Sequence, residues 1–363
     1  MKKIFPLLFY APFAAVALTL NIGPGHEFDR IEDALEVAYE GDTLAVYPRA
    51  DGAPYLKTAL LVNIPITLRA MGEEHVTLDG EGFNYSGAGN VPRAIVQFDP
   101  GSSGSVLDGF VLQNARNESG NGAGVRINQA DNVTITNCVM RGCDTGVMSN
   151  GGPGGAAVGQ LLTHCVITQN GAPTPTGYSN NLYLGGAGVT LRHCEISEAT
   201  DAHNVKSRAH HLRVEDCVIR HAANREFDIV DQAGVTDVPG ADLILLRNKI
   251  IKKPGGMAGN KNLVHFGTDG GAERIGTIYA VSNLLDSTYI SPLFDLSSRV
   301  GVRLEYNEVE NVQINGGKML SLRHPEAWAA GRANIFPAGY DISGYVEDPE
   351  DPDDLQDAPM FLK

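Results

Sequence analysis

The feature that most constrains the fold is a six-residue phrase that recurs along the chain. It reads ITNCVM, LTHCVI, LRHCEI, VEDCVI, LLRNKI, AVSNLL and LEYNEV, and successive copies are 23 to 35 residues apart. Each copy has apolar residues three places before and two places after a cysteine or asparagine anchor. Short alternating strands repeated at such a period are typical of a solenoid. The anchors are Cys138, Cys165, Cys194, Cys217, Asn248, Asn283 and Asn307, and Gly109 and Asn334 extend the series at its ends.

Each repeat has room for two or three short strands, and the lack of helical periodicity favours strands over helices. The pattern therefore predicts an all-β parallel β-helix of about 10 rungs, stacked about 4.8 Å apart. The anchors then form a ladder inside the coil, where asparagine amides bond to their counterparts on neighbouring rungs. A metal site is the alternative for the cysteines, but it needs thiolates that converge from several directions. A linear ladder favours core packing.

The ends of the chain differ from the repeats. We expect a signal peptide over residues 1–17, an N-terminal cap over 18–43, the β-helix over 44–337, and an irregular C-terminal cap with an acidic tail over 338–363. Lys2 and Lys3 precede an apolar stretch, and Ala15-Val16-Ala17 fits a signal-peptidase site. Apolar residues at helical spacing in HEFDRIEDALEVAYEGD predict a short capping helix within 26–42.

The overall charge limits the partners. A net charge of −15 and a pI of about 5 argue against nucleic acid and anionic membranes. The five cysteines do not have the spacing of a disulfide scaffold. We predict a secreted or periplasmic monomer that has no membrane association once its signal is removed.

The stretch HEFDRIEDALEVAYEGDTLAVYP, followed by these rungs, resembles the start of the pectate-lyase-like right-handed β-helix superfamily. The resemblance covers roughly residues 20–340 and implies a right-handed parallel β-helix. It does not specify an activity, because many unrelated chemistries share this scaffold.

A second strand follows each anchor, and its alternation directs the middle residue outward. Long Gly/Pro-rich connections before two of these strands predict walls of a cleft. The predicted outward column is Met148, Tyr183, Lys206, Asp228, His265, Asp295 and Ser321. Two residues further on, the same face is expected to carry Arg208 and Arg323, and two residues before, Asn181, Asn204 and Glu226.

The leading functional hypothesis is a polysaccharide lyase that cleaves a uronic-acid polymer by β-elimination. This reaction needs a cation on the uronate carboxylate, a base for the C5 proton and an acid for the leaving oxygen. Arg208 is the candidate carboxylate binder, Lys206 or His265 the base, and Tyr183 the second proton carrier. The resemblance also implies Lys and Arg in such roles. If Asp228 contacts Lys206 it stabilises the ammonium, and His265 or Tyr183 becomes the better base.

Other interpretations remain open from the sequence. Lys206 and Asp228 form, in the simplest case, an exposed cross-strand ion pair worth less than about 1 kcal/mol. A glycoside hydrolase is a second hypothesis, because Asp228 and Asp295 lie two rungs, about 9.6 Å, apart, near the carboxyl separation of inverting enzymes. A third is a non-catalytic carbohydrate-binding solenoid, although the one tryptophan, Trp328, lies outside the column.

The expected partner is an acidic polysaccharide or oligosaccharide. No calcium-binding motif is visible, so we predict no cofactor, with Ca²⁺ near the carboxylates as the alternative. The remaining candidates for substrate binding are Asn181, His203, Asn204, Glu226, Asp231, Asp295 and Arg323.

Overall fold

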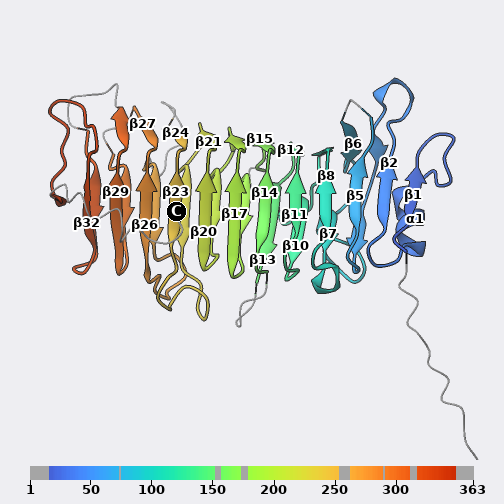
Figure 1. Cartoon of the computed structure of the whole chain (residues 1–363), viewed down its shortest axis with the longest axis horizontal. Coiled ribbons are helices and arrows are strands. Elements are labelled where there is room, and N and C mark those ends of the chain that lie inside the picture. Colours follow the sequence, from blue (N-terminus) through green and yellow to red (C-terminus); the bar gives the residue numbers. More distant parts are fainter. Residues whose placement is uncertain are drawn as a thin grey trace, which may run out of the picture.

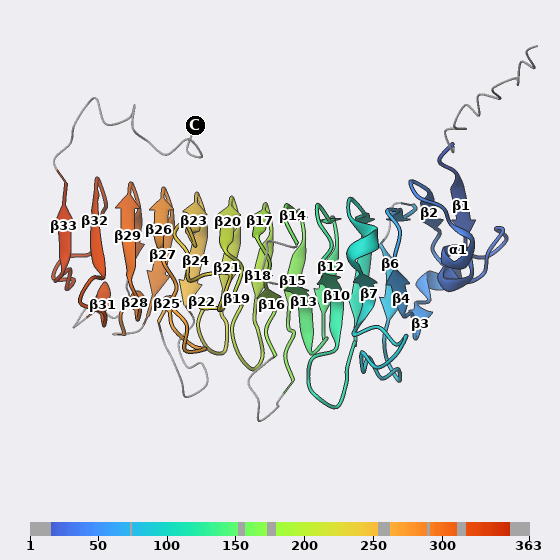
Figure 2. The same cartoon turned by 90° about the horizontal axis from the view of Figure 1, so that it is seen from below.

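The computed structural model describes residues 16–72, 75–151, 157–172, 179–252, 262–288, 291–310 and 317–348. Over these ranges the strands form three long parallel sheets that wrap an elongated solenoid (Figures 1 and 2). We name the three sheets A, B and C. In each rung the chain passes from sheet A to sheet B to sheet C, and it then returns to sheet A. This architecture confirms the predicted all-β, right-handed parallel β-helix.

The strand bounds follow the rungs. In the described ranges, sheet A has thirteen strands, which are β1 (Thr19–Ile22), β2 (Thr43–Val46), β5 (Thr67–Ala70), β8 (Val106–Asp108), β11 (Thr134–Thr136), β14 (Gln160–Thr163), β17 (Gly188–Arg192), β20 (His211–Glu215), β23 (Leu243–Leu246), β26 (Gly276–Val281), β29 (Val300–Glu305), β32 (Trp328–Arg332) and β33 (Tyr345–Glu347). Sheet B consists of β3 (Tyr55–Leu56), β6 (Val76–Asp79), β9 (Phe110–Gln113), β12 (Val139–Arg141), β15 (Val166–Thr168), β18 (Glu195–Ser197), β21 (Val218–Arg220), β24 (Lys249–Lys252), β27 (Leu284–Ser287) and β30 (Glu308–Glu310). Sheet C consists of β4 (Leu60–Val62), β7 (Ala94–Phe98), β10 (Ala123–Asn128), β13 (Thr145–Asn150), β16 (Leu182–Leu184), β19 (Val205–Ser207), β22 (Phe227–Val230), β25 (Val264–Gly267), β28 (Phe294–Leu296) and β31 (Leu320–Leu322).

The N-terminal end of the coil is covered by α1 (Ile31–Val37), which lies within the range expected for a helix and contacts β1, β2 and β4. It buries Ile31 and Ala34 against the first rungs. Short 3-10 turns, η1 (Ala50–Gly52) and η2 (Pro100–Ser102), lie on connections. No helix in the described part of the chain is long and apolar enough to cross a membrane. Most of the expected signal peptide (1–15) and the end of the acidic tail (349–363) lie outside the described residues.

The corner between sheets A and B explains the repeated phrase. The residue before each anchor has a left-handed φ of 52° to 56° in Asn137, His164, His193, Asp216, Arg247, Ser282, Tyr306 and Ala333. Gly109, with φ +87°, occupies this same corner, because Asp108 pairs with Thr136 and Val111 pairs with Val139. The assignment of Gly109 as an anchor was therefore wrong by one residue, and Phe110 takes the anchor position.

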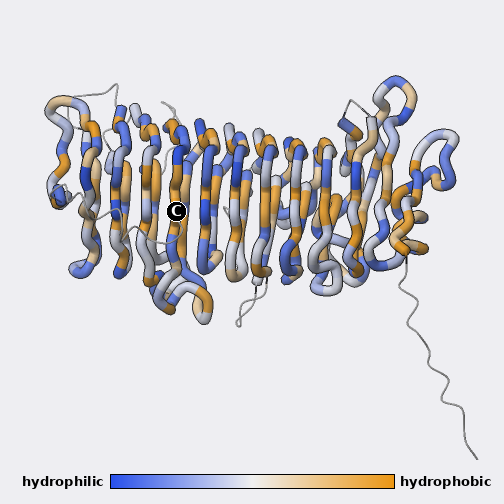
Figure 3. The backbone as a smooth tube through the Cα atoms, in the orientation of Figure 1, coloured by the Kyte–Doolittle hydropathy of each residue, from blue (hydrophilic) through white to orange (hydrophobic). Residues whose placement is uncertain are grey.

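The anchors form the predicted internal ladder. The Cys217 amide donates to Asn248 Oδ1 (2.9 Å), and Asn248 donates to Asn283 Oδ1 from its backbone (2.8 Å) and side-chain amide (3.0 Å). Asn283 and Asn307 repeat this pairing with the next asparagine, ending at Asn334. The five cysteines are buried and free. The asparagine side chains thus satisfy each other's hydrogen-bonding groups inside the apolar core. Around this core, hydrophobic and hydrophilic positions alternate along the coils (Figure 3).

Candidate functional site

Sheet C aligns the predicted outward column in register. Each member pairs with the next across adjacent strands, and the inward neighbours Val205 and Ser207 are completely buried. The column is less exposed than expected, because Asp228 and His265 are buried. The connection after β25 carries Asp269, which contacts Lys206 of the column. The connection after β22 carries Asp231, which binds the segment that contains Asp269. The column residues, in order, are Met148, Tyr183, Lys206, Asp228, His265, Asp295 and Ser321.

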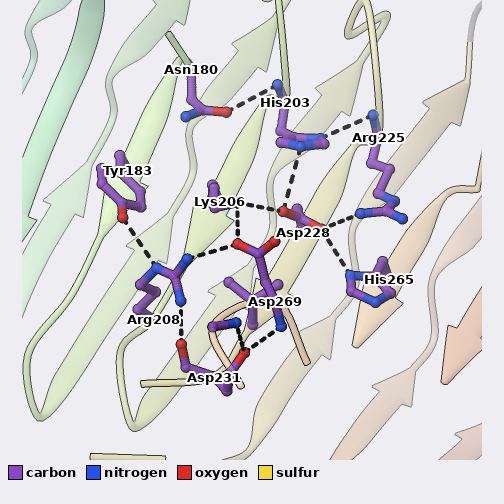
Figure 4. A network of polar contacts seen from close by, with 12 residues as sticks. Asn180, Tyr183, His203, Lys206, Arg208, Arg225, Asp228, Asp231, His265 and Asp269 are labelled. Atoms are coloured by element: carbon purple, nitrogen blue, oxygen red, sulfur yellow. Dashed lines mark hydrogen bonds and ion pairs between the residues drawn. The ribbon is translucent and has the colours of Figure 1, made fainter. Parts of the chain in front are cut away.

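Asp228 is the centre of the site (Figure 4). Its Oδ2 atom lies 3.0 Å from Lys206 Nζ and 3.4 Å from His203 Nε2. Its Oδ1 atom accepts hydrogen bonds from Arg225 and, at 2.8 Å, from His265 Nδ1. One carboxylate therefore holds four basic side chains from three consecutive rungs, which contain β19, β22 and β25.

The hydrogen bonds define the proton positions on both imidazoles. The Arg225 backbone N–H donates to His203 Nδ1 (3.2 Å), so the proton of neutral His203 is on Nε2 and faces Asp228. His265 donates from Nδ1 to Asp228, which leaves its Nε2 atom facing Ser297 Oγ at 2.9 Å. Such fixed tautomers are typical of histidines that are held for a defined role.

Charge and burial act in opposite directions on these groups. Burial raises the pKa of Asp228, but His203, the hydrogen bond from His265 and the charges of Lys206 and Arg225 outweigh it and hold that pKa well below its usual range. Burial lowers the pKa of Lys206, but Asp228 and Asp269 outweigh it and raise that pKa overall. Burial lowers the pKa of His203 to about 4. At neutral pH, Asp228 and Lys206 are therefore charged and His203 is neutral.

A second carboxylate lies over the cations. Asp269 Oδ2 is 3.0 Å from Lys206 Nζ and 2.7 Å from Arg208 Nη2, and its side chain is 43% exposed. The Arg208 Nε–H donates to the Tyr183 hydroxyl at 3.1 Å. Lys206, Arg208 and Tyr183 thus form one partly exposed patch, in which the two cations share one carboxylate oxygen of Asp269.

Asp231 holds the segment that carries Asp269. Its carboxylate accepts backbone N–H groups from Asp269, Gly270 (2.7 Å) and Ala272 (2.8 Å), and its carbonyl accepts from Arg208. These N–H donors outweigh burial and lower the pKa of Asp231. Asp231 was predicted to bind substrate, but the structure places it as a clamp beneath the connection.

Comparison with known proteins supports the fold. A family model described as "Right handed beta helix region" matches residues 100–264. The solved pectate lyase Pel9A has a TM-score of 0.54 at 10% identity, covering 92% of this chain and 79% of that chain. The chain therefore has the fold of a right-handed parallel β-helix, similar to that of this pectate lyase.

Two further solved structures are similar to this chain at comparably low identity. The tailspike gp49 of Acinetobacter baumannii bacteriophage Fri1, a capsular polysaccharide depolymerase, has a TM-score of 0.50 at 10% identity, covering 94% of this chain and 64% of that chain. An alginate lyase from Paenibacillus sp. str. FPU-7 has a TM-score of 0.45 at 13% identity, covering 91% of this chain and 99% of that chain. None of the curated proteins matches this chain by sequence. The site of this β-helix must therefore be interpreted from its own residues.

Three predicted site residues lie inside the β-helix instead of on its outer face. Asn181, Asn204 and Glu226 are completely buried at the corner between sheets B and C. Asn181 Nδ2 donates to Asn204 Oδ1 (2.7 Å), Asn204 donates to Glu226, and Glu226 lies 3.5 Å from Lys252 Nζ. The outward prediction was wrong because the strands begin one residue later, so the alternation does not extend into the corner.

The far end of the column is closed. Asp295 is completely buried and its Oδ2 atom is 2.5 Å from Arg323 Nη2, whose side chain is 59% exposed. Asp228 is also buried, with 3% of its side chain exposed. Neither of these two carboxylates is open to a glycosidic bond, and the depressed pKa of Asp228 leaves it without a proton to donate. The geometry therefore gives no support to hydrolysis by this pair.

Three residues of the site were missed by the sequence analysis. Arg225 lies in the turn before β22, and Asp269 and Ser297 follow β25 and β28. They belong to connections whose paths the strand alternation does not define. The only signal in the sequence was that each of the three is a polar residue within two positions of a column strand.

Exposure separates residues that can touch a polymer from residues that support them. Lys206 and Arg208 have 13% and 21% of their side chains exposed, and Tyr183 is half-buried. His203 and His265 lie beneath, with side chains 9% and 8% exposed. Within the ranges described, no group of three His, Cys, Asp or Glu residues is placed to hold a metal ion.

Proposed function

We propose that this chain is an exported polysaccharide lyase that cleaves a uronic-acid-containing polymer by β-elimination. The fold supports a carbohydrate-active enzyme, because the two solved structures reported above with TM-scores of at least 0.50 are described as a pectate lyase and a capsular polysaccharide depolymerase. The charged and apolar N-terminal residues support export to the periplasm or the medium.

The observation that carries the proposal is the convergence of Lys206 Nζ and Arg208 Nη2 on one carboxylate oxygen of Asp269. The same two cations offer a uronate carboxylate a charge-assisted site. Neutralising that carboxylate acidifies the C5 proton by stabilising the negative charge that develops as the proton leaves. In this proposal the substrate carboxylate takes the place of the Asp269 side chain.

Tyr183 is the group best placed to move the proton. Its oxygen already accepts a hydrogen bond from Arg208, and a phenolate beside a guanidinium forms a charge-assisted pair. The phenolate takes the C5 proton, the C4–O bond breaks as the C4=C5 bond forms, and the phenol returns the proton to the leaving oxygen. Lys206 is unsuited as the base, because its contact with Asp228 keeps it protonated.

The supporting groups hold Lys206 in place. Asp228 fixes the ammonium from below, and His203, Arg225 and His265 fix Asp228. His265 can reach solvent through only 8% of its side chain, so it acts in this proposal as a positioning residue.

The experiment is a panel of anionic polysaccharides (polygalacturonate, alginate and chondroitin) followed by absorbance of the unsaturated product and by new reducing ends. The proposal expects absorbance to rise on at least one polymer, and Tyr183→Phe to slow that rise by about 100-fold or more. Arg69→Gln, a change of an exposed cation on β5 of sheet A, is the control and should retain activity. Reducing ends without absorbance on every polymer would contradict the proposal.

A second candidate function, hydrolysis of a sugar ester, is favoured by one observation. Ser297 Oγ, His265 and Asp228 form a continuous chain, with 2.9 Å from Ser297 Oγ to His265 Nε2 and 2.8 Å from His265 Nδ1 to Asp228 Oδ1. A half-buried serine backed by a buried histidine and carboxylate is the arrangement of an activated nucleophile. The Thr268 N–H also donates to Ser297 Oγ (3.0 Å) and holds it in place.

Ser297→Ala separates the two candidates. Release of acetate or methanol from an esterified polymer that is lost in this variant would favour ester hydrolysis. Under the lyase proposal, Ser297→Ala retains most of the absorbance signal, because Ser297 contacts neither Lys206 nor Tyr183.

A further inference from the structure

The outward column continues beyond Tyr183 to a second group of cations. Arg126 on β10 is in register with Met148 on β13, which is in register with Tyr183 on β16. Arg93 lies just before β7, the next strand of the same sheet. The two arginines therefore lie on the face that carries the proposed active site.

A hollow of about 280 Å³ lies between these cations and Tyr183. Its apolar side consists of Met148 and Tyr183, which pack on Ala94 and Ala123. The other side of the hollow is polar and cationic. An apolar side opposite a cationic side suits an anionic sugar, because the sugar ring has apolar faces and charged substituents. The lining residues that matter here are Arg93, Asn121, Arg126, Met148, Asn150 and Tyr183.

Neither guanidinium has a carboxylate partner among the described residues. Arg126 donates to Met148 Sδ (3.3 Å) and Asn150 Oδ1 (3.2 Å), and Arg93 donates to the Ser86 carbonyl (3.1 Å). The nearby Asp99 carboxylate accepts instead from the side-chain amides of Gln97 (2.9 Å) and Asn128 (2.8 Å).

These two arginines lack the direct ion pairs that Lys206 and Arg208 make with carboxylates. Burial, followed by the charge of Arg93, lowers the pKa of Arg126, and Asp99 offsets this only in part. A chain with net charge −15 thus keeps two half-buried, unpaired arginines beside its proposed active site. Half-buried cations in this state attract an anion strongly.

We propose that Arg93 and Arg126 form a second anion subsite, which binds a carboxylate or sulfate on the same polymer several sugar units from the bond that is cleaved. Arg126 and Lys206 are three strands apart, about 14 Å, so a single sugar ring cannot reach both. The substrate is then a polyanion that extends from Lys206 toward β10. The other direction is unfavourable, because the Asp295 carboxylate already neutralises Arg323 there.

This inference relies on the proposed function for the position of the cleaved bond, but not for binding itself. The test is therefore affinity electrophoresis through gels that contain polygalacturonate, alginate, dextran sulfate or neutral dextran. The wild-type chain should be retarded by an anionic polymer and not by dextran. Arg93→Gln with Arg126→Gln should weaken this binding by roughly tenfold per arginine lost.

Matched variants keep the result interpretable. Arg126→Lys keeps the charge and should retain most of the binding, and Arg69→Gln, which changes an exposed cation on sheet A, should bind as wild type. Retardation by polyuronates alone assigns a carboxylate to the subsite, and retardation by dextran sulfate alone assigns a sulfate. Unfolding midpoints of all variants report whether the double variant is folded.

Two results would overturn the subsite. One is a folded double variant that binds as tightly as wild type, and the other is a wild-type chain that binds no polyanion. If the polymer binds through these arginines but is never cleaved, the subsite stands and the lyase proposal fails.

Discussion

Lys206 Nζ lies 3.0 Å from Asp228 Oδ2, and the two residues are direct partners on the adjacent strands β19 and β22. Asp228 is buried and Lys206 is only partly exposed, with 3% and 13% of their side chains exposed, so the pair is not the weak surface ion pair that its spacing in the sequence also allowed. Burial makes the pair interdependent, because either charge alone would be left in a poorly solvated site. This contact explains why Lys206 is assigned to binding and not to proton abstraction.

Removal of the central carboxylate should destabilise the fold. In Asp228→Asn, Lys206 and Arg225 lose their buried counter-charge, and we expect the free energy of unfolding to fall by about 3–5 kcal/mol. Chemical denaturation measures it. Asp216→Asn is the control, because Asp216 pairs with Arg247 on an open surface and should cost less than about 1 kcal/mol. Equal losses in both variants would contradict the central role of Asp228.

Two buried groups should give stability opposite dependences on pH. The folded pKa of His203, about 4, lies below its unfolded value near 6.5, so the unfolded chain binds the extra proton and stability is lost as pH falls from 6.5 to 4. Burial raises the folded pKa of Glu226 to about 7, so its contribution is present below about 4.5 and is lost as pH rises through 7.

The single variants should separate these contributions. His203→Gln should leave a stability that falls more steeply with rising pH between about 4.5 and 7, whereas Glu226→Gln should leave one that rises more steeply over the same interval. Denaturation curves across this interval measure both slopes. A slope that is the same in the two variants would show that neither group titrates as described.

The asparagine ladder should be costly to interrupt. Asn283 accepts two hydrogen bonds from Asn248 and donates to Asn307 Oδ1 and the Leu245 carbonyl, both at 2.9 Å. Asn283→Ala strands these buried partners, and we expect a loss of about 2–4 kcal/mol in unfolding free energy. Cys194→Ala removes only weak thiol contacts and should cost about 1 kcal/mol. A smaller loss for Asn283→Ala than for Cys194→Ala would contradict the ladder's role.

At the left-handed corner between sheets A and B, glycine should be more stable than valine, which is the reverse of their order within a strand. Ser282 is exposed and has φ +56°, so Ser282→Val should cost about 1–2 kcal/mol, while Ser282→Gly should be neutral or stabilising. Thr190, in the middle of β17, is the matched control, where valine should be tolerated and glycine should cost more. Thermal unfolding of the four variants tests the contrast, which fails if both sites rank the substitutions alike.

Asp269 should compete with the substrate. Because its carboxylate lies on the cations proposed to bind a uronate, Asp269→Ala should lower KM for the cleaved polymer severalfold. Initial rates over a range of polymer concentrations measure this change, with Asp237→Ala on the neighbouring connection as a control. A raised KM would indicate that Asp269 instead helps to bind the substrate.

The sequence predicts the rungs and the column well because one repeated phrase determines the register. The anchors align sheet B, and a period of two then defines which side chain of each sheet C strand points outward. The same rule fails for Asn181, Asn204 and Glu226, which lie at a corner where the strand has not yet begun. Arg225 and Asp269 were also missed, because the turns that carry them have no periodicity that places a side chain.

The most direct test of the account is to digest a cleaved polymer in heavy-oxygen water and weigh the products. Elimination at Lys206, Arg208 and Tyr183 predicts unsaturated fragments that carry no solvent oxygen, and a loss of these fragments in Tyr183→Phe. Saturated fragments in which one heavy oxygen has been gained for each bond broken, on one of the two new ends, would contradict the lyase and show that the bond is hydrolysed.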